Sequence, residues 1–278
     1  MALHSVKCDA HKIQRILKNQ LKILFVNSEI ISTGKFSDKR ENLIKNTVLK
    51  NEVKDVFIEH ISIKGNYVFT EDAKTDVLDI LLTLGGEGSL EINDVIHRIN
   101  TSSIVRVQYN TGYKIDVEEG KEFSFLRLRK LLDKKDIEVV KNRIDEFSKL
   151  YLKALADCPT YKEDIKSEKT LNRMILPEGL VPRFAMGSVE TEGPDEVGEH
   201  EHPMLDQIFF GLEGCRCSCF ADGEETLLTE NMMLHIPLAS KHYVSVAEGD
   251  KLAYIWMDFF LTLEGEKYMG EQHQMEDE

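Results

Sequence analysis

The chain has 278 residues, of which 42% are hydrophobic, and a formal net charge of −14. This length and composition predict a folded protein of one large or two ordinary domains and argue against global disorder. Acidic residues number 49 against 35 basic ones. That balance argues against nucleic acid and against an anionic membrane surface as partners, because both require a basic footprint.

The sequence begins without a continuous apolar stretch of the signal-peptide type, and no later run has the length of a membrane span. Its five cysteines are an odd number, which disfavours a disulfide framework. We therefore expect a cytoplasmic protein that does not enter a membrane.

The first part of the chain is typical of an all-β domain. A short helix is predicted over residues 9–19 and a strand over 22–27. Between residues 53 and 129, short β-type runs alternate with turn-forming pairs such as Gly85-Gly86. Many short strands at this spacing predict a sandwich or barrel, which we assign to residues 1–130.

Residues 131–169 have a different pattern and are predicted to connect two domains. Apolar residues from Ile137 to Leu155 recur every three or four positions, which is one face of an amphipathic helix. Asp133 is the predicted N-cap. Pro159 should end the helix, because the residue before a proline avoids the α region. The polar residues that follow are expected to be a linker.

The β pattern resumes in residues 170–265, with strands predicted over 184–190, 207–212, 215–220, 226–228, 232–236, 242–246 and 252–260. Asp222-Gly223 has the composition of a hairpin turn. Residues 266–278 are expected to be a polar tail. Because the two β regions have the same texture, we predict an all-β protein made of a duplicated barrel.

Three histidines and one glutamine in the second β region form a candidate metal site. His200 and His202 alternate and should face the same side of a strand. Gln207 should start the adjoining strand, and His242 should come from the far side of the sheet. Asp206 is a competing ligand, one residue before Gln207. Imidazole-rich sites suit one divalent transition-metal ion, here Zn, Mn, Fe or Ni.

The order of these residues resembles the cupin superfamily. In its first motif, His-x-His is followed by three or four residues, an acid, six residues and a glycine, which here is Gly214. Its second motif ends in a proline and a histidine, which match Pro237 and His242. Asn231 and Ala239 replace the two glycines of that motif, and Gly198 is displaced in the first. Gln207 occupies the position where the family usually has a carboxylate.

The resemblance implies two cupin barrels of the jelly-roll type, joined by the helical linker, with a metal in the second barrel only. In the first barrel, Gly86 corresponds to Gly214 and Asp79 to Gln207. Asp72 and Lys74 stand at the histidine pair, Tyr113 at the last histidine and Gln108 at the proline. We expect this barrel to be structural. A structural role is also expected for His235, and buried apolar packing for Cys215, Cys217 and Cys219.

Two-barrel cupins with one metal site include the deoxyuronate and 5-deoxyglucuronate isomerases, to which this chain is distantly similar. This resemblance implies an isomerase that acts on a sugar acid or keto-sugar by metal-assisted proton transfer. The alternatives are an iron-dependent dioxygenase and a non-enzymatic protein that binds a small molecule. Arg183 is expected to orient an anionic substrate and Asp258 to face the cavity. We also expect a homo-oligomer, namely a dimer.

Overall fold

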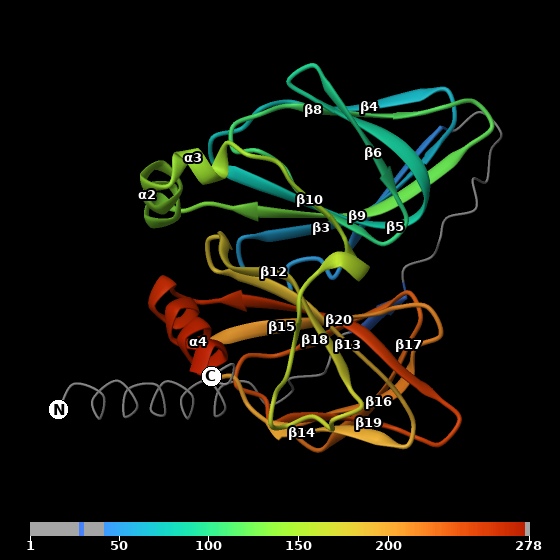
Figure 1. Ribbon diagram of the computed structural model, residues 1–278, viewed down its shortest axis with the longest axis vertical. Coiled ribbons are helices and arrows are strands. Elements are labelled where there is room, and N and C mark those ends of the chain that lie inside the picture. Colours follow the sequence, from blue (N-terminus) through green and yellow to red (C-terminus); the bar gives the residue numbers. More distant parts are fainter. Residues whose placement is uncertain (1–27, 31–41, 276–278) are drawn as a thin grey trace.

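The computed structural model of the chain describes residues 28–30 and 42–275, so the helix and the strand predicted over 9–19 and 22–27 lie outside the described residues. The predicted all-β fold is confirmed. Figure 1 shows two barrel-like halves stacked one on the other, with α2, α3 and α4 at one end of the barrels and a short 3-10 helix, Leu155–Asp157, where the halves meet. No helix in the described part of the chain has the length and apolar composition needed to cross a membrane.

The first half is one strongly curved sheet in which β5 is long enough to join both walls. Its main path runs β10-β7-β5-β9-β3-β2, and β4, β6 and β8 pair with one another or with β5. The strands are β2 (Leu43–Val48), β3 (Val56–Lys64), β4 (Tyr67–Glu71), β5 (Val77–Ile92), β6 (Val95–Asn100), β7 (Ser103–Arg106), β8 (Tyr113–Val117), β9 (Glu122–Leu131) and β10 (Tyr151–Ala154).

The second half consists of two sheets that face each other. The larger runs β1-β18-β15-β20-β13-β12-β11 and the smaller runs β14-β19-β16-β17. The strands are β1 (Ser28–Ile30), β11 (Thr160–Tyr161), β12 (Leu171–Val181), β13 (Phe184–Glu192), β14 (Asp195–His200), β15 (Leu205–Gly211), β16 (Arg216–Ala221), β17 (Glu224–Thr229), β18 (Met232–Ile236), β19 (His242–Val246) and β20 (Lys251–Phe260). The seven strands predicted here are all present, whereas β11, β12 and β14 were not predicted.

The predicted linker helix is shorter than expected. Asp133 is indeed the N-cap of α2 (Lys134–Asn142), and its side chain accepts hydrogen bonds from two backbone N–H groups. A four-residue helix, α3 (Ile144–Phe147), follows, and the chain then leaves the helical path. Residues 151–154 form β10 because they pair with β7, so tertiary pairing overrides their helical spacing. The chain crosses between the halves after β10 and before β11, which pairs with β12.

Both ends of the described chain depart from the predicted boundaries. Although residues 1–130 were assigned to the first barrel, β1 pairs with β18 of the second half. Residues of the predicted polar tail form α4 (Leu263–Met275). Glu266 explains the docking of this helix, since its buried carboxylate accepts hydrogen bonds from the N–H groups of Gly179 and Arg183 in the β12–β13 turn.

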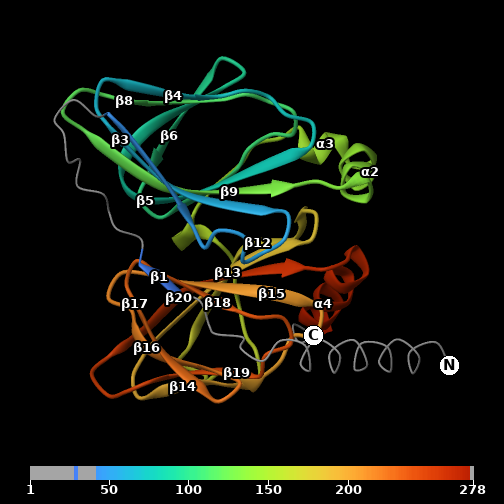
Figure 2. The same ribbon diagram turned by 180° about the vertical axis from the view of Figure 1, so that it is seen from behind.

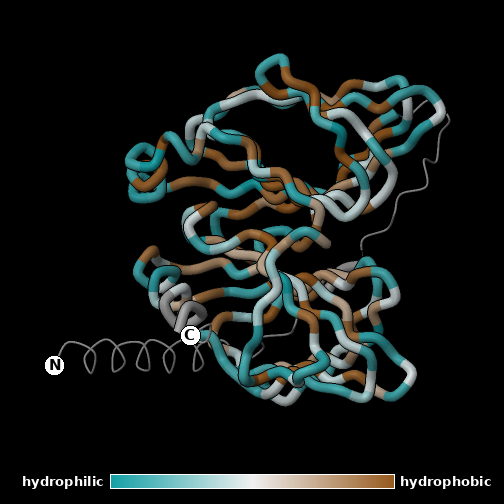
Figure 3. Tube along the Cα trace, in the orientation of Figure 1, coloured by the Kyte–Doolittle hydropathy of each residue, from teal (hydrophilic) through white to brown (hydrophobic). Residues whose placement is uncertain are grey.

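Apolar side chains form one core inside each barrel and a third core between the barrels. Phe125 belongs to the first core and Phe209 to the second. The third contains residues from both halves, such as Ile58 and Met186, so the two large sheets pack face to face. Figure 2 shows the same stacking from behind, and Figure 3 shows hydrophobic stretches on the strands where the halves meet. This contact makes the halves one packed unit.

Candidate metal centre

The three predicted histidines lie together at one end of the second barrel. His200 is the last residue of β14 and pairs with His242, the first residue of β19. His202 follows in the loop after β14. Their ring nitrogens lie within 4.8 Å of one another, a separation that a single metal ion can bridge. Because β14 and β19 are neighbours in the smaller sheet, the prediction that His242 comes from the far side is wrong.

Two of these imidazoles are oriented by backbone carbonyls. The Nδ1 of His200 lies 2.8 Å from the Gly198 oxygen, and that of His242 lies 3.0 Å from the Ser240 oxygen. A carbonyl can only accept, so each Nδ1 carries the proton and each Nε2 keeps its lone pair. The Nε2 of His242 is buried and has no hydrogen-bond partner. A metal ion is the partner that such a lone pair fits.

Burial keeps these rings neutral. It lowers the pKa of His200, and it lowers the pKa of His242 to about 4 with a further contribution from the nearby His200. Loss of hydration disfavours the charged imidazolium, which is the physical cause of both shifts. Neutral imidazole is the form that binds a metal.

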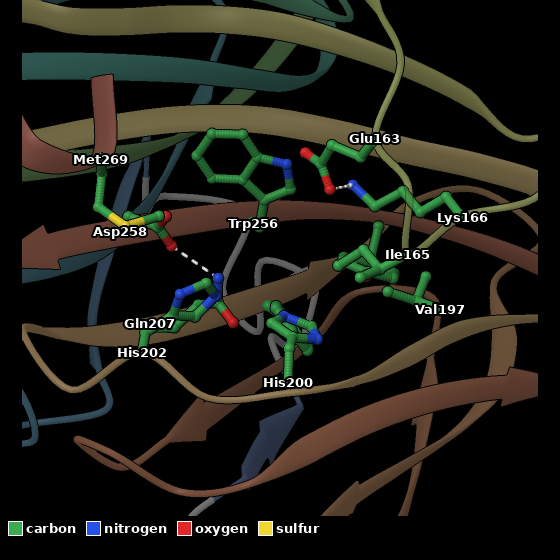
Figure 4. A pocket seen from close by; sticks show the side chains of 12 residues that line it. Glu163, Ile165, Lys166, Val197, His200, His202, Gln207, Trp256, Asp258 and Met269 are labelled. Atoms are coloured by element: carbon green, nitrogen blue, oxygen red, sulfur yellow. Dashed lines mark hydrogen bonds and ion pairs between the residues drawn. The ribbon is translucent and has the colours of Figure 1, made fainter. Parts of the chain in front are cut away.

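Gln207 completes the cluster from the opposite sheet, so the prediction that it starts the strand adjoining the histidine pair is wrong. It lies on β15 and is 6% exposed. Its amide N–H group donates to the carboxylate of Asp258 on β20 over 2.7 Å. This hydrogen bond identifies the other amide atom as oxygen, and that Oε1 is buried without a partner. Figure 4 shows the amide between Asp258 and the histidines.

Asp206 faces away from the cluster. Its carboxylate accepts a hydrogen bond from the Leu238 N–H and lies 3.3 Å from the Nε2 of His235. Successive residues of a strand point to opposite faces, so only one of the two neighbours can reach the histidines. The side chain that does so is that of Gln207. His235 also contacts Glu52 of the first half, so it connects the two barrels and does not take part in the cluster.

At the two positions where the cupin motif has glycine and this chain does not, the backbone still has the positive φ that glycine favours. Asn231 and Ala239 both have φ of 59°. This left-handed region is easy for asparagine and unfavourable for alanine. The turn around Ala239 is held by its N–H, which donates to the His202 oxygen. The turn at Ala239, in the second motif, therefore holds the loop that contains His202 of the first motif. Gly214 and Gly86, matched in the two barrels, also share positive φ values of 72° and 76°.

A cavity of about 60 Å³ opens beside the cluster. Asp258, a predicted cavity residue, lies on its wall together with His200, His202 and Gln207. Its remaining lining residues are Glu163, Ile165, Lys166, Val197, Phe209, Tyr254, Trp256 and Met269. Figure 4 shows Glu163 and Lys166 across the cavity from the histidines.

Sequence reasoning missed Glu163 and Lys166, because they lie in the segment expected to be only a linker. Their side chains form an ion pair of 2.7 Å and are 15% and 5% exposed. Within that polar segment, no spacing or motif distinguishes Glu163 or Lys166 from the other charged residues. Only the folded position of the segment, beside β14, brings these charges to the site.

Arg183 is not part of the cavity wall. It lies in the turn between β12 and β13, where its guanidinium donates to Asp136 and forms an ion pair with Asp133 at the start of α2. This corrects the expectation that Arg183 orients a substrate, because its positive charge pairs with the Asp133 and Asp136 carboxylates instead. The cysteines Cys215, Cys217 and Cys219 are buried in the second core, as predicted.

The first barrel has a different set of side chains at the matching place. Asp79 on β5 pairs in the sheet with Arg129 on β9, as Gln207 pairs with Asp258. The Arg129 guanidinium donates to Asp79 over 3.0 Å, and the Tyr113 hydroxyl donates to the same carboxylate over 3.1 Å. No histidine of the described residues lines the small cavity there. That the first barrel is structural and holds no metal stays a prediction.

Comparisons with known proteins identify the fold. No protein-family profile matches the chain, and no curated protein matches it in sequence. Among solved structures, a cupin 2 conserved barrel domain protein from Leptotrichia buccalis superposes with a TM-score of 0.60 at 15% identity, covering 86% of this chain and 99% of that one. The chain has a cupin fold.

Two further structures agree. The Lactobacillus farciminis oxalate decarboxylase formate complex gives a TM-score of 0.63 at 12% identity and covers 87% of this chain and 90% of that one. A putative glyoxylate induced protein from Pseudomonas aeruginosa also gives 0.63 at 12% identity, with 78% and 79% covered. The cupin resemblance is thus confirmed for the fold. The finer similarity to deoxyuronate isomerases stays a prediction.

Proposed function

We propose that this cupin is a metal-dependent enzyme that acts on a small molecule by metal-assisted proton transfer, in the manner of an isomerase of a sugar acid or keto-sugar. One observation carries the proposal: the Nε2 of His242 and the Oε1 of Gln207 are both buried without a hydrogen-bond partner, next to His200 and His202. Unpartnered buried lone pairs are costly unless something binds them.

The donor set fits a divalent transition metal. Three imidazole nitrogens and one amide oxygen are ligands that zinc, manganese, iron and nickel accept. When bound, such an ion polarises a carbonyl or hydroxyl oxygen, and here its charge is not reduced by an anionic ligand. Asp258 positions the Gln207 oxygen by holding the amide nitrogen.

The cavity wall also contains groups that can hold a proton. Asp258 is hydrogen-bonded to Gln207, whereas Glu163 lies across the cavity beside Lys166. A nearby ammonium favours the ionised form of a carboxylate. Because its carboxylate lies across the cavity from the histidines, we expect Glu163 to accept the proton that moves during isomerisation.

The aromatic residues of the wall favour a second candidate. Phe209 and Tyr254 pack with ring centroids 4.5 Å apart, and Trp256 completes this side of the cavity. Such a wall also suits an aromatic substrate of an iron-dependent dioxygenase. Bound iron with oxygen consumption would favour this alternative, and zinc, manganese or nickel without oxygen uptake would favour the isomerase.

Metal analysis tests the site. Protein purified without chelator is expected to contain about one metal ion per chain, and His200→Ala is expected to lose it. His235→Gln is the matched control, since His235 is a buried histidine of the same barrel on the other face of its sheet. Equal and negligible metal in the wild type and both variants would disprove the site.

A panel of keto-uronates and keto-sugars in deuterated water tests the reaction. The metal-loaded protein is expected to promote exchange of a carbon-bound proton for deuterium in at least one compound, which NMR detects directly. If the protein holds metal but exchanges no proton in any compound, a non-enzymatic binding protein becomes the better assignment.

A further inference from the structure

Part of the segment between the two barrels, residues 163–166, lines the cavity and is attached to β14 by backbone contacts. Lys166 forms a β-bridge with Val197, and the Gly198 N–H donates to the Ile165 oxygen over 2.8 Å. The Lys166 N–H in turn donates to the Glu163 oxygen, which closes a turn. These backbone contacts attach the segment to β14, the strand that ends in His200. These contacts fix the position of Glu163 and Lys166 relative to His200.

A charged pair is a costly choice for a segment that only covers a cavity. The Lys166 side chain is 5% exposed, and its ammonium contacts the Glu163 carboxylate and lies 5.5 Å from the centre of the Tyr161 ring. Replacing a buried ion pair by apolar side chains is often neutral or stabilising. A lid made of apolar residues like its neighbour Ile165 would close the cavity at lower cost. The charge at this place therefore suggests recognition of a ligand.

The charges around the cavity indicate which kind of ligand it is. The four expected metal ligands are neutral, so a divalent ion would keep its full charge of two. Asp258 and Glu163 each contribute one negative charge, and Lys166 contributes the single Lys or Arg charge on the described wall. The sum is about one positive charge in a small cavity. An anion of low charge matches this balance better than a neutral molecule or a cation.

We infer that Lys166 is the anion-binding residue of this cavity and that the ligand is a small carboxylate with a second oxygen function, such as a hydroxy or keto acid. The inference rests on the proposed function, because the second oxygen is expected at the histidine cluster. The ligand's carboxylate accepts a hydrogen bond from the Lys166 ammonium, in competition with Glu163. Lys166 thus selects the substrate, and Glu163 sets how strongly it does so.

Binding of two matched probes tests the assignment. Glycolate carries a carboxylate, and glycolamide is its neutral counterpart of nearly equal size. Both are titrated into cobalt-loaded protein, with the visible spectrum of the metal and calorimetry as readouts. The wild type is expected to prefer glycolate. Lys166→Met should weaken glycolate binding about tenfold, the worth of one charge-assisted hydrogen bond, and leave glycolamide unchanged.

Two variants separate recognition from simple closure. Glu163→Gln removes the competing carboxylate, so glycolate should bind a few-fold more tightly. Lys169→Met is the control, because that lysine belongs to the same segment but is half exposed and donates to backbone oxygens outside the cavity. If the segment acted only as a lid, Lys166→Met would change the affinities for both probes equally.

The outcomes distinguish the two proposals. Equal glycolate affinity in fully loaded wild type and Lys166→Met, or no detectable glycolate binding, would overturn the role of Lys166 and leave the metal site intact. A wild type that does not take up cobalt would overturn the proposed function, and the inference with it.

Discussion

The two barrels use the same pair of strand positions in opposite ways. In the first, Asp79 is bound by the Arg129 guanidinium. In the second, Gln207 donates to Asp258. The first arrangement uses the carboxylate oxygens in ion pairs and hydrogen bonds, whereas the second leaves the amide oxygen without a partner. The two barrels share one fold, and the residues at these two paired positions decide whether an oxygen atom is left without a partner for a metal ion.

The first residues of two matching strands also differ in whether their polar atoms have a protein partner. Tyr113 begins β8 and donates to Asp79, whereas His242 begins β19 and has a buried nitrogen without a partner. In the first barrel Arg127 adds further ion pairs with Glu59 and Glu71. At this place in the first barrel, the Asp79 carboxylate and the Arg127 guanidinium are therefore partnered by other protein groups. At the matching place in the second barrel, the His242 Nε2 and the Gln207 Oε1 have no protein partner.

Removing the last histidine should break this contrast most strongly. His242→Ala is expected to abolish stoichiometric metal binding, with affinity reduced at least a hundredfold, because it removes a buried ligand. Tyr113→Phe in the first barrel should leave the metal content unchanged. Metal analysis after dialysis measures both. Retention of one ion by His242→Ala, or its loss in Tyr113→Phe, would contradict the assignment of the metal to the second barrel.

Disrupting the ion pairs of the first barrel should act on stability instead. Arg127 is 3% exposed between Glu59 and Glu71. Arg127→Met removes the ion-pair partner of Glu59 and one of three partners of Glu71, which keeps Lys74 and Arg129. Loss of such a partner costs about 3 kcal/mol in the free energy of unfolding when the pair is buried. Urea denaturation of the metal-free protein measures the loss. Lys114→Met, which breaks an exposed pair with Glu91, should cost less than about 1 kcal/mol and is the control.

Acid should affect the two barrels of the metal-free protein in different pH windows. Because burial lowers the pKa of His242 to about 4 from 6.5, the unfolded chain takes up this proton first, and stability falls as the pH drops from 6.5 towards 4. In Glu71, burial raises the pKa, but hydrogen bonds from Lys74 and Arg127 outweigh it and lower the pKa from 4.5 to about 2. Its contribution is present above pH 4.5 and is lost as the pH falls towards 2.

Denaturation curves between pH 7 and pH 3 check this order. His242→Gln should flatten the loss between pH 6.5 and pH 4, and Glu71→Gln should flatten the loss below pH 4.5. This is the smallest of the expected effects, since each shift belongs to a single group among many that titrate. Unchanged pH profiles in both variants would show that other groups dominate the acid sensitivity.

The local sequence pattern was sufficient to predict most strands of the second barrel. The predicted strands over 232–236 and 242–246 coincide with β18 and β19 because their residues are apolar or alternate and are bounded by turn residues. Asp222-Gly223 forms a turn with both residues at positive φ, as the pair predicts. The spacing of His200, His202, Gln207 and His242 also indicated one cluster, and the structure brings these residues together.

Other features depended on partners far away in the sequence. β14 has the mixed, polar sequence DEVGEH and is a strand because it pairs with β19. Residues 151–155 continue a helical spacing, yet β10 forms because β7 offers a free edge. The position of Arg183 was misjudged for the same reason, since its ion-pair partners precede it by about fifty residues.

Strand alternation and the spacing of side chains are local properties, so the all-β class and the set of candidate metal ligands could be predicted from the sequence alone. Only the tertiary structure decided which face Gln207 and Asp206 take, that the two sheets of one barrel supply the ligands jointly, and that Glu163 and Lys166 lie over the cavity. Those outcomes depend on pairings between distant segments, and the energies of such pairings are not encoded in local spacing.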